Sequence, residues 1–211
     1  MKTKLLFLAV FVLFSTLSFA QSDRESLSLI RVNGTYSAFA SGKRATNSEN
    51  GKLGYSIELG GKAFLSNSNG LFIEGTGQFF WTHLPFNTAL VGGGNTGYII
   101  GQDYLRECGF GIKGVFGYDF ILNNYLSLEV FSGPIVNLTV NYGPSNNTWD
   151  YKHYLNRFNY RWQAGVGLNF KQFGVNATFT DDLVNRGKHH HTYRTYMISL
   201  GIAYHFSISG K

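Results

Sequence analysis

Hydrophobic and polar residues alternate with a period of two along most of the chain. The pattern is clearest from Tyr196 to Phe206, where even positions are aromatic or aliphatic and odd positions are mostly small or polar. From Phe158 to Phe170 most even positions are again apolar, while the odd positions are Asn, Arg, Gln and Gly. Because successive side chains of a strand point to opposite faces, each segment predicts a strand with one apolar and one polar face.

The same alternation recurs often enough to predict eight strands, and no stretch carries a useful helical period. The strands are expected near residues 27–39, 53–65, 70–83, 107–120, 124–142, 158–170, 173–180 and 196–206. The connections alternate strictly between short (66–70, 123–124, 171–172) and long (about 40–52, 84–102, 143–156, 181–193).

Strict alternation of short and long connections is typical of an up-and-down transmembrane barrel. We therefore predict an all-β fold, a single eight-stranded antiparallel up-and-down transmembrane β-barrel with short periplasmic turns and long external loops. Pro134 lies inside the fifth strand, where it cannot donate to a ladder, so a bulge is expected there.

The first twenty residues have a different pattern. Lys2 and Lys4 precede a mostly apolar run, which ends in Ser18-Phe19-Ala20. This arrangement is typical of a cleaved secretory signal peptide, and the run is short for a membrane-spanning helix. We expect residues 1–20 to be the signal peptide and residues 21–211 to be the barrel domain.

Composition favours lipid around the apolar faces. Charged residues make up 14% of the chain and aromatic residues 17%, with 26 glycines, whereas a soluble domain has about 25% charged residues. Aromatic residues also gather towards both ends of the expected strands, as in the interfacial girdles of membrane barrels. A soluble β-sandwich or lipocalin-like barrel, with apolar faces inward, is the alternative. The formal charge of +6 is modest and does not indicate nucleic acid in an exported protein.

The polar faces would then line the interior of the barrel. Charges with no partner are costly to bury, so inward charges are expected to form paired networks that fill a small barrel rather than leave an open channel. The expected interior charge network consists of Arg31, Glu58, Lys62, Glu74, Glu107, Lys113, Glu129 and Arg161.

With these features the chain resembles the small outer-membrane β-barrel proteins of Gram-negative bacteria: the OmpX-like, opacity-protein-like and PorT-like "outer membrane protein beta-barrel" families. The resemblance covers residues 21–211 and implies a multi-pass barrel in the outer membrane, in contact with lipid and lipopolysaccharide. It also implies recognition by the barrel-assembly machinery, because Gly201, Tyr204 and Phe206 resemble the terminal-strand signal. Here Ser207 to Lys211 follow the last aromatic residue, whereas the family usually ends on it.

Function is less constrained than fold. We expect a non-enzymatic protein, without cofactor or metal, whose external loops bind an unknown surface ligand or protect the envelope. The histidine triplet could bind a metal or an anionic surface, although adjacent histidines in a loop are more often simply solvated. Alternatives are an accessory of an envelope secretion or transport complex, a narrow pore, and a soluble periplasmic β-barrel binding protein. The candidate loop contacts are Lys43, Arg44, Trp149, Tyr151, His153, Tyr154, His189, His190 and His191.

Overall fold

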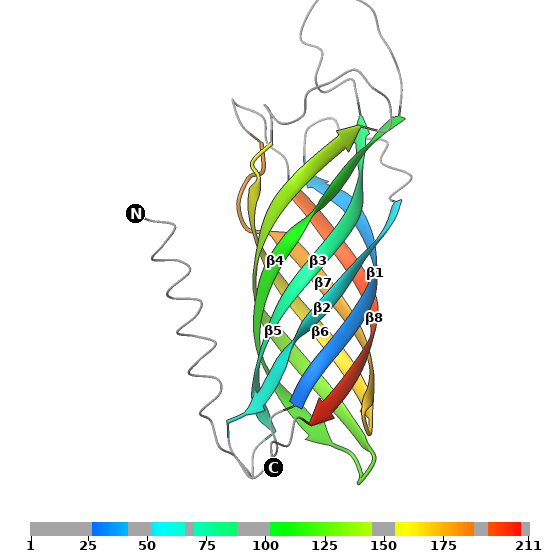
Figure 1. Ribbon diagram of the computed structural model, residues 1–211, viewed down its shortest axis with the longest axis vertical. Coiled ribbons are helices and arrows are strands. Elements are labelled where there is room, and N and C mark those ends of the chain that lie inside the picture. The colour runs from blue at the N-terminus through cyan, green and yellow to red at the C-terminus, as the bar shows by residue number, and fades with distance from the viewer. Residues whose placement is uncertain are drawn as a thin grey trace, which may run out of the picture.

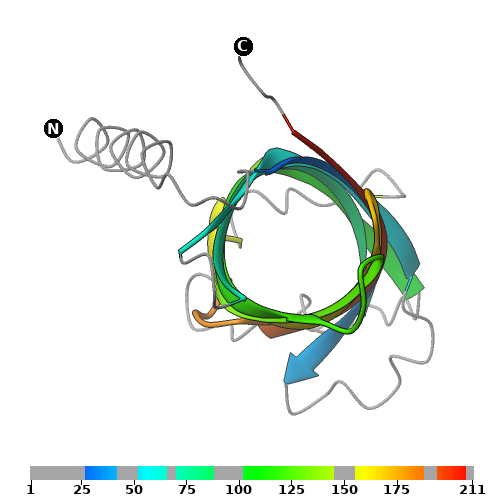
Figure 2. The ribbon, with the colours of Figure 1, turned by 90° about the horizontal axis from the view of Figure 1, so that it is seen from below.

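The chain forms a closed eight-stranded antiparallel barrel, so the predicted fold class is confirmed. A computed structural model describes residues 27–41, 52–65, 70–87, 102–144, 155–187 and 194–207. Each strand pairs with its neighbours in sequence, and β1 pairs with β8 to close the ring (Figures 1 and 2). The strands are β1 (Leu27–Ser41), β2 (Lys52–Phe64), β3 (Leu71–Asn87), β4 (Gln102–Ile121), β5 (Leu126–Pro144), β6 (Phe158–Phe170), β7 (Phe173–Asp182) and β8 (Arg194–Ser207).

The two faces of the barrel wall have the predicted chemistry. Along β8 the outward Ile202 is 65% exposed, whereas its inward neighbour Ala203 is 3% exposed. Strand β6 shows the same alternation, with Phe158 and Tyr160 outward and Asn159 inward. Closure pairs the backbone of every strand on both sides, which a bilayer requires because its core offers no hydrogen bonds.

The two ends of the barrel differ, and we name them the turn end and the loop end. At the turn end, β4 joins β5 through 122–125 and β6 joins β7 through Lys171 and Gln172. The Asn123 side chain accepts hydrogen bonds from the backbone amides of Tyr125 and Leu126, and Lys171 has a positive φ of 54°. The loop end carries the four longer connections, which lie largely outside the described residues.

Two details differ from expectation. Strands β3 and β4 are longer than expected. Their ladder continues to Asn87 and Gln102, whereas the sequence predicts strands near 70–83 and 107–120. The ladder between β2 and β3 ends at Trp81, and past this residue the backbone groups of β3 pair with those of β4. Backbone pairing of this kind does not require regular alternation of apolar side chains.

Pro134 does not mark a bulge. The register between β4 and β5 is the same on both sides of it, from Lys113↔Ile135 to Phe116↔Ser132, and the shift lies instead between Cys108 and Gly109. Because Gly133 has no Cβ, its backbone lies close to Gly114 and Val115 of β4, and the strand passes the proline in register.

No helix among the described residues is long and apolar enough to cross a membrane. The expected signal peptide, residues 1–20, lies outside the described residues and stays a prediction.

Candidate functional site

The barrel interior is the most elaborate polar region of the described chain. Each of the eight charged residues expected inside is at most 4% exposed, and together they come from strands β1 to β6. They form a central cluster, a pair towards the turn end and a cluster towards the loop end.

The central cluster is built around Arg31. Its guanidinium donates to both oxygens of Glu74, at 2.9 and 3.1 Å, and to Glu58 at 2.9 Å. Glu58 also pairs with the Lys113 ammonium at 2.8 Å and accepts a hydrogen bond of 2.8 Å from the Asn33 amide. The two-pronged contact with Glu74 fixes the plane of the guanidinium, as a single point contact would not.

A separate ion pair joins Lys62 of β2 to Glu129 of β5 across the barrel. The Lys62 ammonium also lies 4.0 Å from the centre of the Phe72 ring, within the range of a cation–π contact. Asn169 donates a hydrogen bond to Glu129. The charge of Lys62 is therefore held between a carboxylate and an aromatic face.

The loop-end cluster contains two residues that sequence reasoning did not place inside. Arg161 pairs with Asp182 at 2.8 Å, and Arg186 pairs with Glu107. Glu107 also lies 4.0 Å from Arg161, which links the two pairs. Asp182 continues the inward series Asn176, Thr178, Thr180, so a longer reading of that alternation would have found it. Arg186 follows β7 in no regular pattern, and the sequence carries no signal for its burial.

The ion pairs balance one another. Adding Asp182 and Arg186 to the eight expected charges gives five acids and five bases, each in an ion pair. Buried charges are tolerated when they are paired and hydrogen-bonded. The interior thus ties strands far apart around the ring into one rigid wall.

An apolar plug, which the sequence analysis missed, fills the turn end. It consists of Phe64, Phe72, Val115 and Phe131, all at most 6% exposed. These side chains occupy inward positions, which elsewhere in the barrel are mostly polar. Glycines make room for the rings, since a Cβ on Gly117 would lie 2.6 Å from Phe72 and one on Gly165 would lie 2.6 Å from Phe131.

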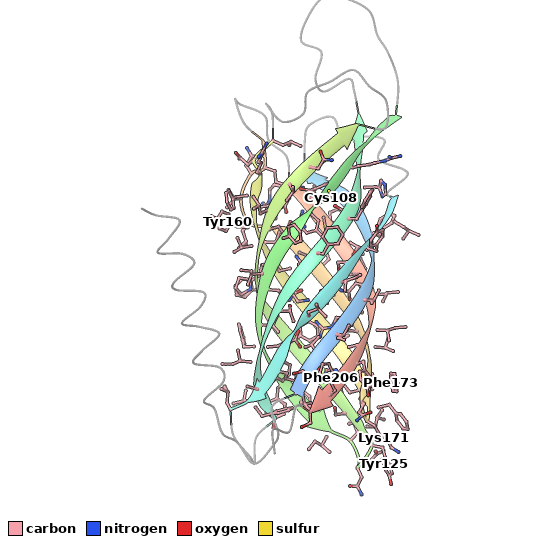
Figure 3. All side chains as sticks on the ribbon, in the orientation of Figure 1. Cys108, Tyr125, Tyr160, Lys171, Phe173 and Phe206 are labelled. Carbon is pink, nitrogen blue, oxygen red and sulfur yellow. The ribbon has the colours of Figure 1, made fainter. Side chains whose placement is uncertain are left out.

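Aromatic side chains ring the exterior near both ends (Figure 3). Towards the turn end, Phe173 and Tyr204 pack with ring centres 5.2 Å apart, and Tyr204 stacks on Phe206 at 6.1 Å. Towards the loop end, Tyr160 and Trp162 are 47% and 40% exposed. Between the rims the outward residues are mainly aliphatic, including Val166, Leu168, Leu200 and Ile202. An apolar band between two aromatic girdles is the exterior of a lipid-embedded barrel.

The three residues resembling an assembly signal divide between the two faces of β8. Tyr204 and Phe206 lie on the exterior, whereas Gly201 lies inside. A side chain on Gly201 would collide with the Asn33 amide, which is held by Ser56 and Glu58. Gly201 therefore has a packing role whether or not it is read by assembly machinery.

All nine candidate loop contacts lie outside the described residues: Lys43, Arg44, Trp149, Tyr151, His153, Tyr154, His189, His190 and His191. The described flanks of two of these loops are joined, however. Leu155 forms a β-bridge with Gly187, and the backbone N–H of Asn156 donates a hydrogen bond of 2.8 Å to the backbone carbonyl of Arg186. Leu155 is 3% exposed and Arg186 is held by Glu107. Leu155 and Gly187, the described residues that border segments 145–154 and 188–193, are thus held next to each other.

Within the described ranges, no three His, Cys, Asp or Glu side chains are grouped as a metal site requires. Cys108 is a free, half-buried thiol near the loop end (Figure 3).

No family model matches the chain, and no curated protein matches it in sequence. Several solved structures are similar in fold. Neisserial surface protein A (NspA) has a TM-score of 0.47 and 10% identity, covering 86% of this chain and 97% of that one. Ail, the attachment invasion locus protein of Yersinia pestis, in complex with the heparin analogue sucrose octasulfate, has a TM-score of 0.46 and 15% identity, covering 86% and 99%. The outer membrane enzyme PagL has a TM-score of 0.49 and 15% identity, covering 82% and 98%.

At such low identity and TM-scores these similarities carry no argument about activity, and the architecture rests on the strand pairing of this chain itself. A closed barrel with an apolar, aromatic-bounded exterior and a polar interior is built to cross a bilayer, and barrels of this kind belong to outer membranes. The chain is an outer-membrane β-barrel. It crosses the membrane with its eight strands, as the family resemblance implied.

Proposed function

We propose that this barrel is a non-enzymatic surface protein whose external loops bind an acidic polymer at the cell surface. The observation that carries the proposal is the filled interior. Ion pairs and the apolar plug occupy the described lumen, and so the barrel acts as a rigid support. The loop end, which we place outside the cell, then supplies the surface for contact with partners.

The arrangement of two loops supports this function. Leu155 and Gly187 are bridged. Leu155 directly follows the aromatic segment 149–154, and Gly187 belongs to the basic, histidine-rich segment 186–194. Aromatic and basic side chains together suit recognition of an anionic partner, through stacking and through charge. The chemistry points to sulfated or phosphorylated polysaccharide.

The test is adhesion of proteoliposomes carrying the purified protein to surfaces coated with dextran sulfate or with uncharged dextran. We expect retention on dextran sulfate that exceeds retention on dextran and falls as salt rises. A variant with His189, His190 and His191 changed to Ala and Lys188 to Gln should lose most of that difference. The matched control is Lys171→Gln, which removes a base at the turn end.

Retention that is equal on both surfaces would contradict the proposal. So would retention that the loop variant leaves unchanged while Lys171→Gln abolishes it. A shift in electrophoretic mobility on boiling verifies that each variant is folded before its adhesion is compared.

A further inference from the structure

The described interior contains a polar chamber between the central and loop-end clusters. It has a volume of about 40 Å³, and its wall includes Glu58 and Lys113 of the central cluster and Arg161 of the loop-end cluster. Of the residues lining it, only Phe80, Ile135 and Met197 are apolar. Residues of the apolar plug take no part in its wall.

Two buried donors in the wall of the chamber have no hydrogen-bond partner among the described residues. They are the Nη2 group of Arg161, which lies 4.0 Å from the Glu107 carboxylate, beyond hydrogen-bond distance, and the Nε2 group of Gln163. The two residues are 4% and 1% exposed. Leaving a buried donor unpaired is costly, because it has lost its hydrogen bond to water without gaining another. Both atoms are donors, so the group that satisfies them must be a hydrogen-bond acceptor.

Size and charge decide which acceptor fits. A water molecule needs about 10–15 Å³ of such volume, so the chamber has room for about three. The surrounding ion pairs already balance, five acids against five bases, and an added anion would have no counter-charge. Polar chambers of this size hold water, whereas apolar ones stay dry.

We propose that the chamber is a permanent binding site for a small cluster of ordered water molecules, which accepts hydrogen bonds from Arg161 and Gln163. The cluster joins the central and loop-end ion-pair networks into one. It does not reach the plug, because none of Phe64, Phe72, Val115 and Phe131 lines the chamber. The proposed water therefore lies in the middle of the barrel, on the loop side of the plug.

Met197 provides a probe for this water. It lines the chamber, is 5% exposed, and its sulfur lies 3.4 Å from the Arg161 guanidinium. X-ray radiolysis of a water held in the chamber generates hydroxyl radicals in place, and these oxidise a neighbouring thioether. A radical scavenger in the bulk solution suppresses oxidation that begins outside the barrel. Mass spectrometry measures the oxidised fraction of Met197 against dose.

We expect Met197 to oxidise with dose despite the scavenger, and Gln163→Leu to reduce that rate severalfold. Thr76→Val is the matched control, because Thr76 is buried and inward but does not line the chamber, and its rate should match the parent. A Met197 in the parent protein that is protected whenever the scavenger is present would overturn the proposal. Because this outcome concerns the parent alone, it decides the question even if Gln163→Leu does not fold.

Discussion

Replacing Arg31 by Met tests most sharply whether paired charges hold the interior together. Arg31 is 2% exposed, and its guanidinium donates to both carboxylate oxygens of Glu74. The substitution keeps an unbranched side chain of similar length but leaves Glu74 buried without its partner. Glu58 keeps Lys113 at 2.8 Å. The loss therefore falls mainly on one carboxylate.

Breaking a buried ion pair by removing one partner costs about 3–5 kcal/mol. Because folded proteins are stable by only about 5–15 kcal/mol, this is a large share of the total. The double variant Arg31→Met/Glu74→Leu removes both members of the pair and leaves Glu58 balanced by Lys113. Apolar replacement of a whole buried pair is often neutral, so most of the lost stability should return.

The assay is reversible urea unfolding in lipid vesicles, followed by tryptophan fluorescence. Arg194→Met is the surface control. Its pair with Asp181 has side chains 43% and 38% exposed, and such pairs contribute about 0–1 kcal/mol. An Arg31→Met effect no larger than that of Arg194→Met, or a double variant as unstable as the single one, would refute the reasoning.

Three further predictions concern packing and the lumen. Phe72→Ala should lower the free energy of unfolding by about 3–5 kcal/mol, because the ring is 1% exposed within the plug; urea titration measures this, and a loss below 1 kcal/mol would show that the plug is loosely packed. Gly133→Ala should destabilise by about 1–3 kcal/mol, since its Cβ would lie 2.7 Å from the Val115 Cα, whereas Gly114→Ala meets nothing within 4 Å and should be neutral; equal midpoints in urea would contradict this. Planar bilayers containing the parent protein should show no resolved conductance steps, because the described lumen is filled; reproducible steps would favour the pore alternative.

The period of two predicts much of this fold and little of its tertiary detail. In β6 and β8 every second residue is apolar, so the faces and the closure of the barrel follow from local sequence. Alternation assigns Glu58 and Arg161 to the polar face but does not say which charges meet. Arg31 reaches Glu74 over β2, which lies between their strands, and only the closed geometry brings them together.

The plug and the loop-end cluster show where sequence reasoning stops. Phe64 and Phe72 occupy inward positions on mostly polar faces, so in the sequence they look like breaks in the alternation rather than like a core. Their packing depends on the space left by Gly117 and Gly165, on other strands. Arg186 lies outside any strand, and its burial depends on Glu107, which is distant in sequence. Contacts across the lumen produce no periodic pattern in the sequence from which they could be predicted.

The most direct test of the central claim, that this chain is a closed barrel in an outer membrane, is heat modifiability in isolated outer membranes. Unboiled and boiled samples are compared by electrophoresis in detergent. A closed, detergent-resistant barrel predicts that the unboiled protein, found in the outer-membrane fraction, changes mobility on boiling. A protein that is soluble in the periplasm and shows no shift would contradict the claim. It would indicate a soluble β-protein whose apolar faces point inward.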